Sequence, residues 1–306
     1  MTAFIIRRLL SLIPVLFGVT LIVFLILRLI PGNPVILSLG TNATPTAVHA
    51  LEHQLGLNKP LWQQYWTYIV GLLQGNMGLS MQSGQPVSTL LAGRLIATMQ
   101  LAFASFLVAI VVGFVFGILA VRYHQSPLDR LILVVATLFL ATPQFWLGLM
   151  LIMVFALILG WFPVFGYGGL LHLVLPALSV GLIAGAVNVR IIRNEMLTII
   201  HQDFIRTAQA KGLPIGRVLI KHALKNALVP TITILGLQLG FLLSGTVIVE
   251  QLFGWPGLGS LLISAIQARD YTLVQGGVLY LSLIFVGVNL MVDLLYAVVD
   301  PRVRYS

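Results

Sequence analysis

The feature that most constrains this chain is a series of apolar stretches, each long enough to cross a membrane. The first runs from about Leu9 to Ile30, and a helix of about 20 residues spans the ~30 Å hydrocarbon core of a bilayer. Lipid offers the backbone no hydrogen-bond partners, so each stretch should satisfy its own amides as a helix. We therefore predict an all-α integral membrane protein with six transmembrane helices, at about residues 9–30, 95–121, 131–158, 172–189, 229–249 and 277–299.

Composition agrees with this class and excludes several activities. Only 8% of the residues are charged, against about 25% in soluble domains. The chain has no cysteine, so it has no disulfide framework, thiolate metal site or cysteine nucleophile. None of its lysines follows a glycine, so it has no P-loop for a nucleotide. We expect no catalytic residue, no metal site and no cofactor in this chain.

The domain organisation follows from the spans. A cleavable signal peptide has a shorter apolar core and a small-residue cleavage site, and Leu27–Pro31 offers no such site. We therefore expect residues 1–30 to form an uncleaved transmembrane helix. An extracytoplasmic segment at 31–94, a core with five spans at 95–299 and a tail at 300–306 follow it.

The distribution of positive charge predicts the orientation of these spans. Six spans place both termini on one side of the membrane, and that side holds thirteen of the 17 Lys and Arg residues. Positive residues mark the cytoplasmic side, so both termini should be cytoplasmic. This topology accounts for the net charge of +9, and we expect no nucleic-acid partner.

Between the fourth and fifth spans, a loop at 190–228 carries a dense group of these charges. Asp203 is a suitable N-cap for a two-turn helix at Phe204–Lys211. Gly212 suits the left-handed position after a helix end, and Pro214 blocks continuation and can start a second helix, which should run to about Leu228. The loop therefore predicts a helix, a sharp turn and a helix, suited to docking a soluble partner. Its basic residues are Arg190, Arg193, Arg206, Lys211, Arg217, Lys221 and Lys225.

The run from Arg206 to Gly212, Arg-Thr-Ala-Gln-Ala-Lys-Gly, together with the later His222-Ala-Leu-Lys-Asn-Ala, resembles a family motif. It is similar to the cytoplasmic loop of ATP-binding cassette (ABC) importer permeases of the dipeptide, oligopeptide and nickel branch. The general motif of such permeases is Glu-Ala-Ala, three residues, Gly, nine residues and Ile-x-Leu-Pro. This chain departs from it at the Glu, the Ile and the Pro, where Arg206, His222 and Lys225 stand.

The resemblance implies a type I ABC importer permease fold with a cytoplasmic coupling-helix loop, in the inner membrane of a bacterium. It implies four kinds of partner: a second homologous permease subunit, two ATPase subunits that bind ATP and Mg, an extracytoplasmic substrate-binding protein, and the lipid membrane. The short helix would dock into a groove of an ATPase subunit. The docking residues so implied are Asp203, Arg206, Thr207, Ala208, Ala210, Lys211 and Gly212.

The segment at 31–94 predicts two short helices, at 46–55 and 60–73. The second is rich in aromatic residues, and Trp and Tyr at such density are typical of a membrane–water interface. It could form a surface for the substrate-binding protein or a lid packed on the helix bundle, and the sequence leaves both open. The aromatic residues are Trp62, Tyr65, Trp66 and Tyr68.

A few polar or helix-breaking residues at membrane depth are candidates for the translocation path. Proline frees backbone groups that neighbouring helices or a cavity must satisfy, but it could equally mark a structural kink, and the polar side chains could equally bridge helices. Gly113 and Gly117 are spaced for close helix contact, and Asp293 is expected to pair with Arg190 or Arg193. The path candidates are Pro143, Gln144, Asn188, Gln238 and Ser244.

The cargo implied by the resemblance is a small peptide of the dipeptide, oligopeptide or glutathione class. A nickel-chelate permease of the same family is the first alternative. From a different class, an ATP-independent secondary carrier would need ionisable coupling groups within its spans, and this sequence has few of them. Many carriers also show an internal repeat, which is not evident here.

Overall fold

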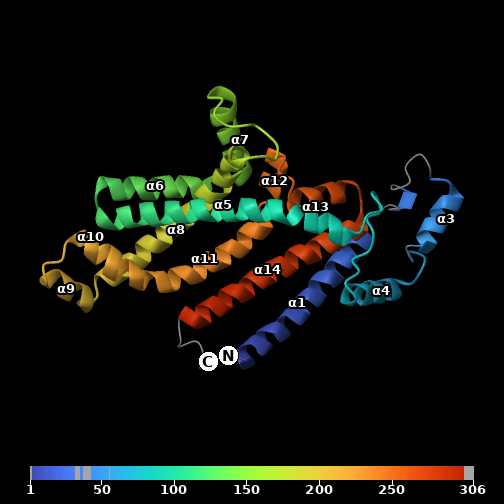
Figure 1. Cartoon of the computed structure of the whole chain (residues 1–306), viewed down its shortest axis with the longest axis horizontal. Helices are drawn as coiled ribbons and strands as arrows, with labels where there is room; N and C mark the ends of the chain where they lie inside the picture. The colour runs from blue at the N-terminus through green and yellow to red at the C-terminus, as the bar shows by residue number, and fades with distance from the viewer. Residues whose placement is uncertain (1, 32–34, 37–42, 55, 300–306) are drawn as a thin grey trace. The chain divides into compact units, whose positions relative to one another are not determined.

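The computed structural model describes residues 2–31, 35–36, 43–54 and 56–299, without the side chains of 2–9, 51, 54, 209, 229–230, 233, 244–245 and 293–299. The described residues are helical with short connections and one isolated bridge, Leu79 to Pro86 (Figure 1). The helices are α1 (Thr2–Leu29), α3 (Pro45–Gln54), α4 (Leu61–Leu73), α5 (Val87–Arg122), α6 (Pro127–Ala141), α7 (Gln144–Leu151), α8 (Leu170–Ile200), α9 (Asp203–Ala210), α10 (Ile215–Arg217), α11 (Lys225–Gly245), α12 (Val247–Phe253), α13 (Leu258–Gln267) and α14 (Tyr271–Val299).

The apolar helices match the predicted spans in number. Within the described ranges, four helices are long and apolar enough to cross a membrane, and six spans result if each of two bent pairs counts as one. The first bent pair is α6 with α7 and the π-helical segment Ile152–Ile158, at an angle of 106°, and the second is α11 with α12, at 49°. The tail at 300–306 lies outside the described residues.

The chain divides into two units, and α5 and α14 each contribute to both. Unit 1 comprises Met1–Thr98 and Pro256–Val286. Its core joins α1, α5, α13 and α14 through side chains such as Leu27, Leu91, Leu258 and Val274. A Cβ on Gly276 would lie only 2.5 Å from Cγ1 of Val87, so this glycine lets α14 approach α5 closely.

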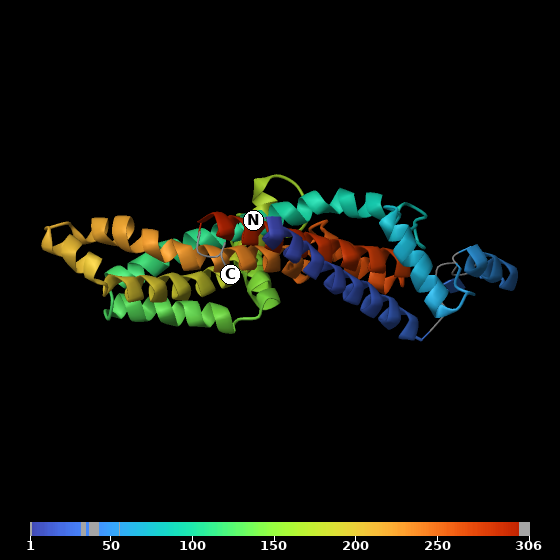
Figure 2. The same cartoon turned by 90° about the horizontal axis from the view of Figure 1, so that it is seen from below.

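Unit 2 comprises Met99–Trp255 and Gly287–Ser306. Here α6, α7 and α11 pack against α8 (Figures 1 and 2). The predicted close contact of Gly113 and Gly117 is confirmed, because a Cβ on Gly113 would overlap Asn188 of α8, and one on Gly117 would lie 3.0 Å from Ile192. Small residues permit such approach of two helices in lipid.

Several predicted helix boundaries differ from the structure, because the helices continue beyond the apolar stretches; α5, for example, begins at Val87 rather than near Leu95. The loop does not begin at Arg190, because α8 continues to Ile200. The predicted helix from Ile215 to about Leu228 is present, but it joins the fifth span directly, because helical structure is nearly continuous from Ile215 through a π-helical segment, Val218–Leu224, into α11. The sixth span begins at Tyr271, where the Asp270 side chain accepts a hydrogen bond from the amide of Leu273 (3.1 Å).

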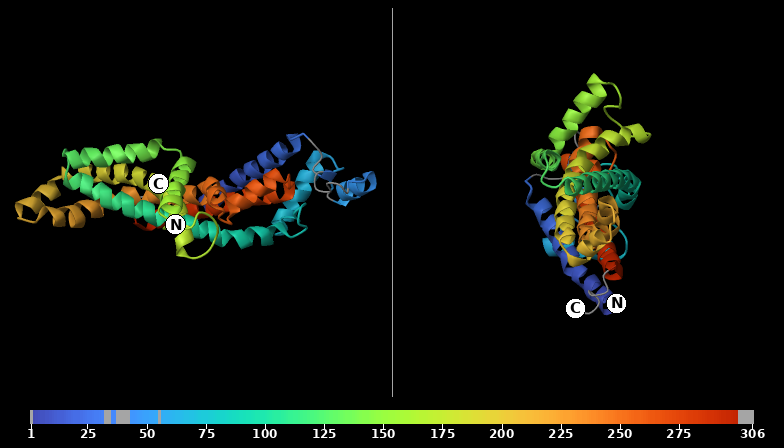
Figure 3. Two further views of the ribbon diagram at one scale, coloured as in Figure 1. Left: turned by 90° about the horizontal axis from the view of Figure 1, so that it is seen from above. Right: turned by 90° about the vertical axis from the view of Figure 1, so that its left-hand side faces the viewer.

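The third span is interrupted at Pro143 as predicted, but the bend is far larger than a kink. Pro143 adopts an extended conformation (ψ 135°) between α6 and α7. Figure 3 shows α7 turning away from the direction of α6. A proline cannot donate the amide hydrogen bond that would continue α6, so the chain can change direction here.

Candidate functional site

The predicted docking helix exists as α9, and one of its two faces is buried. Ile205 is 0% exposed and Ala208 7% exposed, in a cluster with residues of α8 and the π-helical segment such as Met196 and Val218. Positions three apart lie on the same face of a helix, so Ile205 and Ala208 together hold α9 against the ends of the transmembrane helices. Figure 2 shows α9 and α10 joining α8 to α11.

The opposite face of α9 is exposed and polar. The side chains of Asp203 and Arg206 are 98% and 74% exposed and form a loose ion pair of 3.7 Å. Thr207, Ala210 and Lys211 are exposed as well. Ala208, which the sequence analysis includes among the docking residues, lies instead on the buried face and holds α9 in place.

The turn after α9 has the predicted chemistry. Gly212 has a φ of +77°, in the left-handed region, where a residue without a Cβ has no steric penalty. The amide of Leu213 donates to the carbonyl of Ala208 (3.4 Å), which closes the helix end. The helix start differs from the prediction: the Gln202 carbonyl accepts from the amides of Ile205 and Arg206, so α9 begins at Asp203 itself and Asp203 is not the N-cap.

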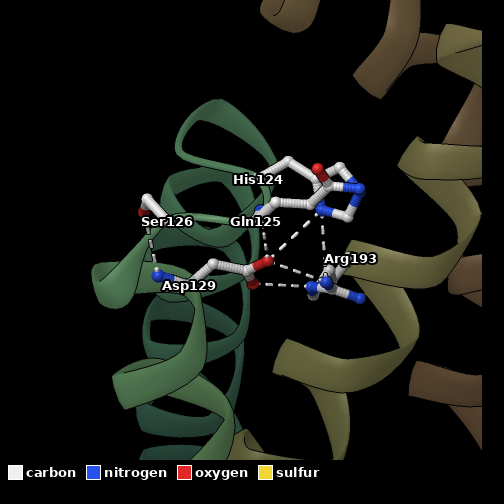
Figure 4. Close-up of polar contacts among 5 residues, drawn as sticks. All are labelled: His124, Gln125, Ser126, Asp129 and Arg193. Carbon is white, nitrogen blue, oxygen red and sulfur yellow. Dashed lines mark hydrogen bonds and ion pairs between the residues drawn. The ribbon is translucent and has the colours of Figure 1, made fainter.

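A buried polar cluster lies between the start of α6 and the later part of α8 (Figure 4). Asp129 is 2% exposed, and its two carboxylate oxygens accept from Nε and Nη2 of Arg193, each at 2.8 Å. One of these oxygens also accepts from the amide of Gln125 (3.0 Å) and lies 3.2 Å from Nδ1 of His124. The cluster therefore joins α6, α8 and the turn after α5.

This cluster was not predicted from the sequence, although a local signal for it exists. Ser126 accepts from the amide of Asp129 (3.3 Å) at the start of α6, and Ser-x-x-Asp before an apolar run is a capping-box pattern. Arg193, one of the two arginines expected to pair with Asp293, pairs with Asp129, and the pairing of Asp293 with Arg190 or Arg193 stays a prediction. The side chain of Asp293 lies outside the described ones.

Two of the five path candidates are brought together by the structure. Nδ2 of Asn188, a residue 1% exposed, donates to Oε1 of Gln238 (2.9 Å) and to the carbonyl of Ala109 (3.2 Å). Nε2 of Gln238 donates to the carbonyl of Ala184 (3.0 Å). The pair therefore bridges α5, α8 and α11, which is the bridging alternative left open by the sequence.

The other three path candidates lie outside this bridge. Pro143 forms the bend between α6 and α7, and Gln144 is the first residue of α7 and is half-buried. Ser244 is near the end of α11, and its side chain lies outside the described ones. For these three residues a role in the path stays a prediction.

We expect Asn188→Ala and Gln238→Ala each to destabilise the fold by about 1 kcal/mol, as hydrogen bonds between membrane helices do. The double variant should lose less unfolding free energy than the sum of the two single variants, because each single change leaves the other amide unpaired. Unfolding by sodium dodecyl sulfate in mixed micelles measures these changes. Gln251→Ala, at an exposed position of α12, is the control, and additive effects of the two variants would contradict the bridge.

Comparison with known proteins identifies the family. Residues 109–305 match the family model of the binding-protein-dependent transport system inner membrane component, and residues 1–102 match the model of the N-terminal part of such membrane components. The chain is 41% identical over 306 residues, covering 100% of both chains, to the glutathione transport system permease protein GsiC of Escherichia coli (strain K12). The same identity and coverage hold for GsiC of Shigella dysenteriae serotype 1 (strain Sd197).

Solved structures show the same fold at lower sequence identity. An inward-facing structure of the MetNI methionine ABC transporter superposes with a TM-score of 0.57 at 20% identity, over 70% of this chain and 97% of that chain. An amino acid ABC transporter crystallised with histidines gives a TM-score of 0.52 at 17% identity, and the match covers 70% of this chain and 94% of that chain. The predicted all-α, type I importer permease fold is confirmed. The chain therefore belongs to the inner membrane components of binding-protein-dependent transport systems and is a multi-pass permease subunit of the peptide family of ABC importers.

Proposed function

We propose that this permease forms, with a second homologous permease subunit, the path of an ATP-driven importer, and that α9 is the element on which an ATPase subunit acts. The observation that carries the proposal is the division of α9 into two faces. Ile205 and Ala208 anchor it to the membrane helices, while Asp203, Arg206, Thr207, Ala210 and Lys211 are exposed to a partner.

This arrangement suits the transmission of force. α9 contacts both α8 and the π-helical segment that leads into α11, so a displacement of α9 acts on two transmembrane helices at once. The Asn188–Gln238 bridge ties the same two helices together at membrane depth. A movement of α9 would therefore tilt α8 and α11 as a pair and change the access to the path, which could include Pro143, Gln144 and Ser244.

The remaining assignments follow from this proposal. ATP and Mg would be bound by two separate ATPase subunits, since the chain has no P-loop. The docking loop and both termini would be cytoplasmic, as the positive charges favour. Residues 31–94 would lie outside, where a substrate-binding protein delivers the cargo.

The cargo we propose is a small peptide of the glutathione class. The support for it is the 41% identity over the full length to permeases that carry the name of glutathione transport. Dipeptides, oligopeptides and chelated nickel are the other cargoes of the branch. The identity of the binding protein recovered in the experiment below would distinguish among these cargoes.

The test is purification of the tagged chain from its native cells in mild detergent, with identification of the accompanying proteins by mass spectrometry. We expect P-loop ATPases, a second permease and a binding protein whose ligand is glutathione or a short peptide. The control is a variant with Arg206→Glu and Lys211→Glu on the exposed face of α9, which should lose the ATPases and keep the second permease. A chain that purifies alone and transports in liposomes without ATP would overturn the proposal.

A further inference from the structure

The short helix α4, which belongs to none of the six spans, packs against the second half of α1 within unit 1 (Figure 1). Oε1 of Gln64 accepts from Nε of Arg28 (3.0 Å), and the hydroxyl of Tyr65 shares a hydrogen bond of 3.0 Å with Oγ1 of Thr20. The ring centroid of Tyr65 also lies 5.9 Å from that of Phe17. These contacts extend along α1 from Phe17 to Arg28, and they favour the lid alternative that the sequence left open.

The same contacts place α4 at membrane depth. The candidate span within α1 runs from Leu10 to Leu29, so Arg28 lies close to one end of the hydrocarbon core. Thr20 precedes Arg28 by eight positions, which is about 12 Å along a helix with a rise of 1.5 Å per residue. The Tyr65 hydroxyl that bonds to Thr20 therefore reaches well inside the span. The helix that carries it lies at the boundary of the hydrocarbon core.

Another face of α4 exposes large apolar side chains. Trp62, Trp66 and Leu73 are 69%, 65% and 84% exposed. With 3.6 residues per turn, these three positions fall within about 40° of one another around the helix axis, and they form one continuous stripe. This α4 stripe has no cover among the described residues of the chain.

The composition of α4 favours lipid as the cover of this stripe. Leu61–Leu73 contains no charged residue, whereas the exposed Lys59 precedes the helix and the exposed Gln74 and Asn76 follow it. A soluble protein that docks and leaves would return the stripe to water in each cycle, and large apolar patches are rarely left in water. Tryptophan suits a membrane interface, because its ring lies in the apolar layer while its N–H stays among the headgroups.

We propose that α4 is a membrane-surface helix whose stripe inserts into the outer leaflet of the bilayer. The proposal rests on the topology proposed above, in which residues 31–94 are extracytoplasmic. The helix would hold the polar turn that follows it at a fixed height above the membrane. That turn is joined to the start of α14 by a buried hydrogen bond, which Oγ of Ser80 donates to Oδ2 of Asp270 (2.5 Å).

Single cysteines can test which side chains water reaches, because the chain has no cysteine of its own. Trp62→Cys, Trp66→Cys and Leu73→Cys are each made in the full chain, which is expressed with its accompanying subunits. Right-side-out membrane vesicles, washed free of binding protein, are treated with a charged maleimide that does not cross the membrane. A thiol in apolar surroundings ionises poorly, and the charged reagent stays in water. We therefore expect each variant to react about tenfold or more slowly than a cysteine in water.

Gln85→Cys is the matched control. Gln85 is exposed in the polar turn of the same segment, so a cysteine there should react rapidly from outside. A second measurement needs no cysteine, because lipids brominated on their acyl chains quench the fluorescence of tryptophans that touch them. A double variant with Trp62→Phe and Trp66→Phe keeps the stripe apolar, and brominated lipids should quench it less than the unmodified chain.

Three results would overturn the proposal. The first is a reaction of the stripe variants as fast as that of Gln85→Cys, or unchanged quenching in the double variant, which would place α4 in water. The second is a fast reaction that slows only when the binding protein is added, which would assign the stripe to that protein. Both would leave the proposed transport function standing. The third is a reaction of Gln85→Cys only after the vesicles are opened, which would contradict the proposed topology itself.

Discussion

Asp129→Asn is expected to destabilise the folded chain by about 3 kcal/mol, because it leaves the guanidinium of Arg193 partly buried without its counter-charge. The Arg193 side chain is only 15% exposed, and Nδ1 of His124 lies 3.3 Å from its Nη2. An asparagine can still accept one hydrogen bond from Arg193 but supplies no negative charge. The loss of unfolding free energy should therefore exceed that caused by an ordinary substitution at the surface.

The change in unfolding free energy can be measured by titration with sodium dodecyl sulfate in mixed micelles. Asp203→Asn is the matched control, because Asp203 is exposed and its ion pair with Arg206 is long at 3.7 Å, so no measurable change is expected. A double variant with Asp129→Asn and Arg193→Gln should be less destabilised than Asp129→Asn alone, because no charge is then left unpaired. Equal effects of Asp129→Asn and Asp203→Asn would contradict this account.

This cluster shows what sequence reasoning could not supply. Asp129 and Arg193 are 64 positions apart, and local patterns carry no information on which acidic residue meets which arginine. From the sequence, Arg190 or Arg193 was therefore expected to pair with Asp293, because of predicted depth in the membrane, and the partnership of Arg193 with Asp129 was not foreseen. Only the packing of α6 against α8 decides the pairing.

The same distinction explains the errors in helix boundaries. Hydropathy marks where the chain enters lipid, and a helix ends where its backbone hydrogen bonds end. α8 continues to Ile200 because Ile192, Met196 and Ile199 keep a buried apolar face beyond the apolar span. The start of α14 was within reach of sequence reasoning, because Asp270 is a favourable residue at a helix N-terminus.

Local backbone chemistry was the most predictable part of the site. Glycine and proline at positions 212 and 214 were enough to predict the end of α9 and the turn that follows. The inward direction of Ala208 was not predicted, although α9 is strongly amphipathic. Ile205 gives the only strong apolar signal for that face, and Ala208 follows it by three positions. At Pro143 a break could be predicted, but the angle of 106° depends on what α7 packs against.

Gly212→Val is expected to lower uptake about tenfold while ATP hydrolysis continues, under our proposal that α9 couples the two. The φ of +77° at Gly212 lies in the left-handed region, where a residue with a Cβ is disfavoured by roughly 1–2 kcal/mol, and every 1.4 kcal/mol changes a population about tenfold. No atom lies within 4 Å of the position of the added Cβ. The variant therefore changes the backbone of the turn without a clash, and the angle at which α9 is held should shift.

Gly216→Val is the matched control for this variant. Gly216 lies in α10, a few residues along the same loop, where an added Cβ also meets no atom within 4 Å and φ is not positive. A valine there costs little in a helix compared with glycine, so uptake should stay near that of the unmodified chain. Uptake of radiolabelled peptide and phosphate release, both measured in proteoliposomes with the partner subunits, separate coupling from catalysis. The two glycines share steric room and differ in φ. Normal uptake in Gly212→Val, or an equal loss in both variants, would therefore show that the conformation of this turn does not control coupling.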